Sequence, residues 1–167
     1  MLEPRASQPE GRLAALRELS QTGIPVGVMV APTIPGLTDH EMPAILQAAR
    51  DAGARFAGYV LLRLPHAVAP LFENWLTTHF PDKASRVLTR IRELRGGKMY
   101  DSRFGTRQRG EGELADVIEK MFELAARRAG LTQRRLALST AHFRRPNDTP
   151  LFDQFDDPPA DAGPGAS

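Results

Sequence analysis

The chain has 167 residues, enough for one domain with a buried core, and its formal net charge at pH 7 is only +2. It contains no cysteine, which excludes disulfides and thiolate-held iron–sulfur clusters within the chain. No apolar run approaches the roughly 18 residues that a membrane helix needs, and no apolar signal core follows the N-terminus. We therefore expect a cytoplasmic protein without a membrane association.

The first part of the chain begins with a helical pattern and then a strand pattern. Residues 9–22 follow helical spacing, with a predicted capping box formed by Ser7 and Glu10 and a stop at Gly23. Residues 24–31, IPVGVMVA, are apolar at almost every position. Such a short apolar run predicts a parallel strand that is buried on both faces.

A second helix and a second strand follow a turn-rich loop, PTIPGLT, at residues 32–38. Thr38 and Glu41 predict another capping box, for a helix over residues 39–52. Residues 56–64 then form the second apolar run. Helices and strands at this spacing are typical of right-handed parallel α/β units. We therefore expect the two runs to pair in parallel, with both helices on one face.

Beyond residue 66 the strand pattern stops. Helical spacing predicts helices at residues 70–80, 81–94 and 113–129, with a basic, glycine-punctuated stretch at residues 95–112 between the last two. From about residue 146 the chain is rich in Pro, Asp and Gly, which predicts a disordered tail. The expected organisation is an α/β part over residues 1–66, a helical extension over residues 67–145 and the tail over residues 146–167.

Three segments, in this order and at this spacing, resemble one known group of enzymes. They are LEPRASQPEGRLAALRELSQTGIPVGVMVAPTIPGLTD, AGARFAGYVLLRLP and RGGKMYDSRFGTRQRGEG. Together they are similar to the C-terminal half of radical SAM proteins of the spore-photoproduct-lyase-like (DNA repair photolyase-like) group, over roughly residues 2–145. The fold class that this resemblance implies is α/β, the C-terminal portion of a partial (β/α)6 radical SAM barrel followed by a helical extension.

The resemblance also implies how a cofactor site would be divided. Barrels of this superfamily hold a [4Fe–4S] cluster on a CxxxCxxC loop after the first strand, and their later strands contact the ribose and adenine of S-adenosylmethionine. Residues 2–5 would end the fourth strand, with residues 24–31 as the fifth and residues 56–64 as the sixth. The first three strands and the cysteine loop are absent from this sequence. The resemblance therefore implies contacts to S-adenosylmethionine from this chain, and a cluster only in the complete enzyme.

The ends of the fourth and sixth strands carry charged candidates for that site. The resemblance places Glu3 and Arg5 at the first of these ends, where a carboxylate suits ribose hydroxyls or an ammonium and a guanidinium suits a carboxylate. The alternative is a solvated end of the chain. Leu62 and Arg63 lie at the other end, where backbone groups would read the adenine edge and Arg63 would hold an acidic group. Alternatively, Arg63 is a rim residue that pairs with a neighbouring carboxylate.

The loop after the fifth strand supplies the remaining cofactor candidates, Pro32, Ile34, Pro35 and Gly36. In the family that it resembles, the glycine turn of this loop packs beside the adenine. Gly36 permits the positive φ or the close backbone approach that a flat ring needs, and Ile34 offers an apolar face. The alternative is a strand-to-helix loop that is held only by turn chemistry.

The basic stretch at residues 95–112 is a candidate nucleic-acid contact. Arg103, Arg107 and Arg109 lie among glycines, with Tyr100 and Phe104 interleaved. Arginines neutralise phosphates and aromatic rings stack on bases, and the resemblance to a group founded on a DNA-lesion repair enzyme favours this hypothesis. The alternative is a loop whose arginines are solvated or held in salt bridges.

Three functions from different classes remain open at this point. The leading hypothesis is a C-terminal fragment or half of a radical SAM enzyme, which supplies the adenosine side of the site. Such a chain is not catalytic alone and needs an N-terminal radical SAM half as its partner. The alternatives are a nucleic-acid-binding module without chemistry and a non-functional truncated product. The residues that would choose a substrate are not identifiable in the sequence.

The lack of cysteine generates a direct prediction. Anaerobic reconstitution of the isolated chain with iron and sulfide should leave it colourless, because no thiolate is present to hold a cluster. Visible absorption spectra and iron analysis after desalting would check this. A stable charge-transfer band with stoichiometric iron would contradict the argument.

Overall fold

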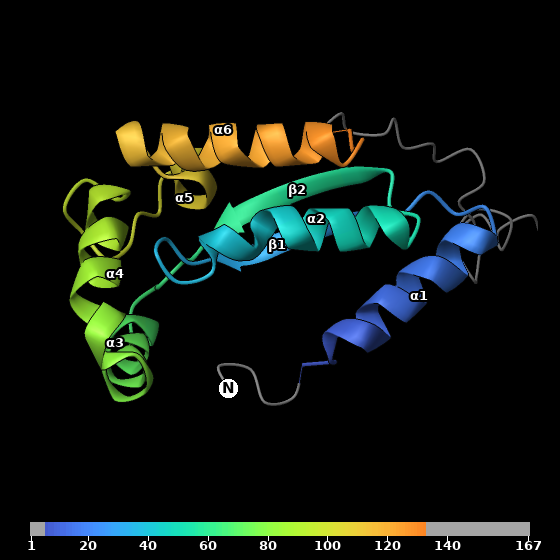
Figure 1. Cartoon of the computed structure of the whole chain (residues 1–167). Helices are drawn as coiled ribbons and strands as arrows, with labels where there is room; N and C mark the ends of the chain where they lie inside the picture. The colour runs from blue at the N-terminus through green and yellow to red at the C-terminus, as the bar shows by residue number, and fades with distance from the viewer. Residues whose placement is uncertain (1–5, 133–167) are drawn as a thin grey trace, which may run out of the picture. The chain divides into compact units, whose positions relative to one another are not determined.

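The structure is a computed structural model that describes residues 6–132, all within one compact unit (Figure 1). Its elements in chain order are α1 (Pro9–Gln21), β1 (Gly27–Thr33), the short 3-10 turn η1 (Asp39–Glu41), α2 (Met42–Asp51), β2 (Phe56–Leu61), α3 (Val68–His79), α4 (Pro81–Glu93), α5 (Thr106–Arg109) and α6 (Glu113–Arg128). Glu3, Arg5 and the tail predicted from residue 146 lie outside the described residues. Within residues 6–132, no helix is long and apolar enough to cross a membrane.

The two apolar runs form a two-stranded parallel sheet, β1 beside β2. The register places Val30 opposite Tyr59, and an irregularity after Val30 then brings Thr33 opposite Leu61. This confirms the predicted parallel pairing and a mixed α/β structure. The partial barrel stays a prediction, because these two strands are the only sheet strands in the described part of the chain.

One face of the sheet is covered, and the other is left open at Met29 by the elements within residues 6–132. Val30, Tyr59 and Leu61 are buried on the face against which α2 and α6 pack (Figure 1). Successive residues of a strand point to opposite faces, and Met29, next to Val30, is 60% exposed. The prediction that residues 24–31 are buried on both faces is therefore wrong, because no element within residues 6–132 covers Met29.

The core consists of two hydrophobic clusters. The first lies between the sheet, α2 and α6, where the rings of Tyr59 and Phe122 approach to 4.8 Å and Leu46 is fully buried. The second joins α3 and α4 to the ends of the strands, through Leu64 and Leu76 among others. Leu61 belongs to the first cluster and Leu62 to the second, so both clusters meet at the carboxyl end of β2.

The two predicted helices before the strands differ in how they pack. α2 has three residues buried in the first cluster, whereas α1 has none, and only Leu16 of α1 packs against that cluster. Leu19 of α1 is 45% exposed. The prediction of two sheet-covering helices is thus confirmed for α2, while α1 reaches only the margin of the core.

Both predicted capping boxes are wrong, because neither α1, η1 nor α2 has a side-chain capping hydrogen bond at its N-terminus. The carbonyl of Ser7 instead accepts a hydrogen bond from Arg12 Nε at 3.1 Å. The hydroxyl of Thr38 accepts one from the Ile34 N–H at 2.9 Å. A proline in the first turn of α1 and of α2 removes one N–H that would need a cap.

The packing of α2 generates a stability prediction with a control on the same helix. Leu46→Ala should lower the free energy of unfolding by about 2–5 kcal/mol, because it leaves a cavity in the first cluster. Ile45→Ala, at a neighbouring position that is 37% exposed, should cost under about 1 kcal/mol. Urea denaturation followed by circular dichroism would compare them. Equal losses for the two variants would contradict this packing.

Candidate functional site

A cavity of about 650 Å³ opens at the carboxyl ends of β1 and β2. One wall comes from the strand ends and includes Pro32 and Leu62, and the other comes from α3 and includes Leu71 and Trp75. In parallel α/β sheets, ligands bind outside the carboxyl ends of the strands, where the connecting loops begin. The cavity therefore lies where this fold class places its ligands.

The wall from α3 is built by helical periodicity. Val68, Leu71, Phe72 and Trp75 recur three and four residues apart, so they share one side of the helix and line the cavity. Phe72 is 4% exposed and also belongs to the second cluster, which anchors this wall. Leu71 is 70% exposed and forms the open part of the wall. Among the described residues, the indole N–H of Trp75 is buried without a hydrogen-bond partner.

The predicted loop at residues 32–38 contributes one of its four candidate residues to this cavity, and that residue, Pro32, lies within β1 rather than after it. Pro32 lines the cavity, whereas Ile34 and Pro35 are buried in the core below. Gly36 has a φ of +80° and packs against Arg90 of α4, so closely that a Cβ there would lie 2.7 Å from Arg90 Nη1. Turn chemistry holds the loop, because the N–H of Gly36 donates to Asp39 Oδ2 at 2.9 Å.

The end of β2 contributes both of its predicted residues, Leu62 and Arg63, to the lining. The backbone of Leu62 is already engaged, because its N–H donates to the Thr33 carbonyl at 2.9 Å and its carbonyl accepts from Arg95 Nη2 at 3.0 Å. Its side chain is the part that remains for a ligand. Within residues 6–132, no carboxylate forms an ion pair with Arg63. Glu3 and Arg5 lie outside the described residues, so their place at this site stays a prediction.

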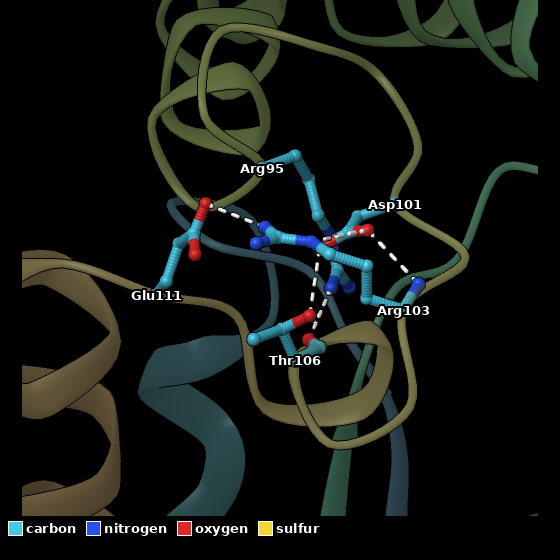
Figure 2. Close-up of polar contacts among 5 residues, drawn as sticks. All are labelled: Arg95, Asp101, Arg103, Thr106 and Glu111. Carbon is cyan, nitrogen blue, oxygen red and sulfur yellow. Dashed lines mark hydrogen bonds and ion pairs between the residues drawn. The ribbon is translucent and has the colours of Figure 1, made fainter.

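Arg95, which the sequence placed among the basic residues of the stretch 95–112, is buried instead. It is 3% exposed, and its guanidinium donates to the carbonyls of Leu62 and of Thr106, the latter at 2.7 Å (Figure 2). Burial lowers the pKa of Arg95. Arg95 lies four residues after Ile91, just beyond the end of α4, and so continues the spacing of the buried residues of that helix, which could have separated it from the solvated arginines.

The arginines of the basic stretch have partners within the chain. Arg103 Nη2 lies 2.9 Å from Asp101 Oδ2 and 2.9 Å from Glu111 Oε1 (Figure 2). Hydrogen bonds from Arg103, and then from the Thr106 hydroxyl, hold the pKa of Asp101 well below its usual range. The contacts thus tie Arg103 to Asp101 within the stretch and to Glu111 near its end, while 61% of its side chain stays exposed.

The other two candidate arginines lie over aromatic rings. Arg109 Nη1 is 2.7 Å from Glu119 Oε1, and its guanidinium lies 4.7 Å from the centre of the Tyr59 ring. The guanidinium of Arg107 lies 5.1 Å from the centre of the Phe104 ring, and Phe104 itself is 90% exposed. Arg103 and Arg109 are therefore held by carboxylates, and of the three candidates Arg107 alone has no ion pair in the described region.

The chain matches no protein-family model, no curated protein and no solved structure. Within residues 6–132, no group of three histidines, aspartates or glutamates lies where it could hold a metal ion. The features of the described residues that bear on function are therefore the cavity and the loop at residues 95–112, which the contacts of Arg95 and Arg103 hold in place.

The ionised Asp101 generates a pH-dependent prediction. Asp101→Ala should lower the melting temperature at about pH 7, and the difference from the wild type should shrink as the pH falls below about 4. The reason is that a pKa depressed in the folded state gives stability that is present above the unfolded pKa and is lost as the pH falls towards the folded one. Thermal unfolding by circular dichroism across this range would measure it.

Glu93→Ala is the matched control, because Glu93 is an exposed carboxylate with no ion pair in the described region. Its melting temperature should follow the wild type at every pH. A deficit of Asp101→Ala that stays constant down to about pH 2 would show that the charge of Asp101 is not what holds the loop.

Proposed function

We propose that this chain is the C-terminal part of a radical SAM enzyme of the spore-photoproduct-lyase-like group and supplies the adenosine side of its S-adenosylmethionine site. The single observation that carries the proposal is the apolar cavity at the carboxyl end of the two parallel strands. Three residues that the resemblance assigned to the cofactor, Pro32, Leu62 and Arg63, line that cavity. Bound there, S-adenosylmethionine would supply the adenosyl group for radical chemistry.

The residues of the cavity fit an adenosyl group. Small-molecule sites are mostly apolar clefts of about 300–1,000 Å³, and this one has a volume of about 650 Å³. Leu62, Leu71 and Trp75 present apolar and aromatic surface to a flat ring. The backbone of Leu62 is occupied by Thr33 and Arg95, so recognition of the adenine edge would fall to the backbone of Arg63 and Leu64, which also line the cavity.

The residues of the chain do not fit an iron–sulfur cluster. Thiolates hold such clusters, and the chain has no cysteine. In this proposal the cluster belongs to a cysteine-bearing N-terminal half, which meets this chain at the open edge of β1. Among the described residues β1 pairs only with β2, and its other edge carries unpaired backbone groups that favour the addition of a strand.

The nucleic-acid alternative has one observation in its favour, the exposed Phe104 with the guanidinium of Arg107 over its ring. An exposed aromatic residue beside a cation is suited to stacking on a base. However, the carboxylates of Asp101, Glu111 and Glu119 engage the other two candidate arginines. The charge available for phosphates is therefore smaller than the sequence suggests, which favours the adenosine site.

The adenosine proposal can be tested by the fluorescence of Trp75, the single tryptophan of the chain and part of the cavity wall. Titration of the full chain with S-adenosylhomocysteine should quench this emission in a saturable manner, with a Kd of about 1 mM or tighter. Leu71→Asp should weaken binding at least about tenfold, because it places a charge on the apolar wall that the adenosyl group would contact.

Leu124→Asp is the matched control, since Leu124 is an exposed leucine of α6 that does not line the cavity. It should leave the titration unchanged. Absence of saturable quenching in the wild type, or equal loss of binding in the two variants, would rule out an adenosine site in this cavity.

A further inference from the structure

The cavity has an uneven charge. Ten of its eleven lining residues are uncharged, and the other is Arg63. The side chain of Arg63 is exposed, and in the described part of the chain no carboxylate pairs with it. A cation at the edge of an apolar cavity is the arrangement that orients a ligand by one polar contact while apolar surface supplies most of the burial.

The carboxylates near Arg63 are engaged by other arginines and do not neutralise it. Arg95 is close enough for the charge of Arg63 to disfavour its protonated form. The guanidinium of Arg95 is committed to two backbone carbonyls, which carry no net charge. Asp101 and Glu111, the acidic residues that favour the charge of Arg95, are both hydrogen-bonded to Arg103. The carboxyl end of β2 therefore has unbalanced positive charge.

We infer that the cavity takes a flat, apolar ligand that carries an anionic group, and that Arg63 binds this group. A carboxylate and a phosphate are equivalent in this respect, because a guanidinium binds either by two parallel hydrogen bonds. The inference concerns the cavity that was assigned above to the adenosyl group, and in that setting it rests on the proposed function. There the anion would be the amino-acid carboxylate of the cofactor or a phosphate of a nucleotide.

A pair of fluorescent probes isolates the anionic contact without any assumption about adenosine. The sulfonate dye anilinonaphthalene sulfonate and the neutral dye phenylnaphthylamine share the same aromatic body. Leu71→Asp, a change on the wall of the cavity, should weaken the binding of both dyes, which would place them in the cavity rather than elsewhere on the protein. Both titrations use the full chain.

Arg63→Gln should weaken the binding of the sulfonate dye about five- to tenfold and leave the binding of the neutral dye unchanged, because only the charged hydrogen bonds are lost. Arg63→Lys keeps the charge and should restore part of the affinity. Arg86→Gln is the control, because Arg86 is an exposed arginine of α4 that neither lines the cavity nor forms an ion pair in the described region. Equal effects of Arg63→Gln on the two dyes, or none on either, would overturn the inference.

Adenosine, adenosine monophosphate and S-adenosylhomocysteine separate this inference from the proposed function. If adenosine monophosphate or S-adenosylhomocysteine binds more tightly than adenosine, and Arg63→Gln removes this difference in affinity, the result supports the inference and the proposed function. It also shows which anion is preferred. If Arg63→Gln loses affinity for the sulfonate dye alone, and no adenosine compound binds to the wild type, the result would support the anion contact and rule out the adenosine site. If Arg63→Gln loses affinity equally for all three adenosine compounds, the result would support the adenosine site and overturn the anion contact.

Discussion

The guanidinium of Arg95 holds together the parts of the chain that surround the cavity. It is buried, and it donates to the carbonyl of Leu62 at the end of β2 and to the carbonyl of Thr106 at the start of α5. A charge taken out of water is costly unless its hydrogen bonds are satisfied. The strand end and the loop after α4 must therefore keep the positions that satisfy Arg95, and these positions define one side of the site.

The same strand end joins the two hydrophobic clusters. Leu61 packs with α2 and α6, whereas Leu62 and Leu64 pack with α3 and α4. A displacement at this point would disturb both clusters, because packed cores transmit strain rather than absorb it. The cavity thus has a rigid inner wall from the strand ends, while the exposed Leu71 and Val68 make its outer wall apolar and open.

The sequence predicted those features that depend on neighbouring residues along the chain. Alternating helical and apolar segments were sufficient for the parallel pair of β1 and β2. The sequence could not show that Met29 is exposed, because an apolar run has the same pattern whether one or both faces are covered. Burial on the second face depends on elements that the local pattern does not contain.

The site was predictable to the same extent. The resemblance placed Pro32, Leu62 and Arg63 near a ligand, and they line the cavity. Ile34 and Pro35 face the core instead, a distinction that depends on where α3 and α4 pack. Asp101 lies only two residues before Arg103, but the partners Glu111 and Glu119 could not be predicted, since they approach Arg103 and Arg109 only through the path of the loop and of α6.

The loose attachment of α1 has a consequence for the dynamics of the chain. No residue of α1 is buried, and its links to the rest include Leu16 and a 3.3 Å hydrogen bond from Ser20 Oγ to the carbonyl of Gly53. Segments with few buried apolar contacts open locally at a small fraction of the global free energy of unfolding. The backbone amides of α1 would therefore exchange with solvent through local opening, independently of the clusters that hold β1, β2 and α6.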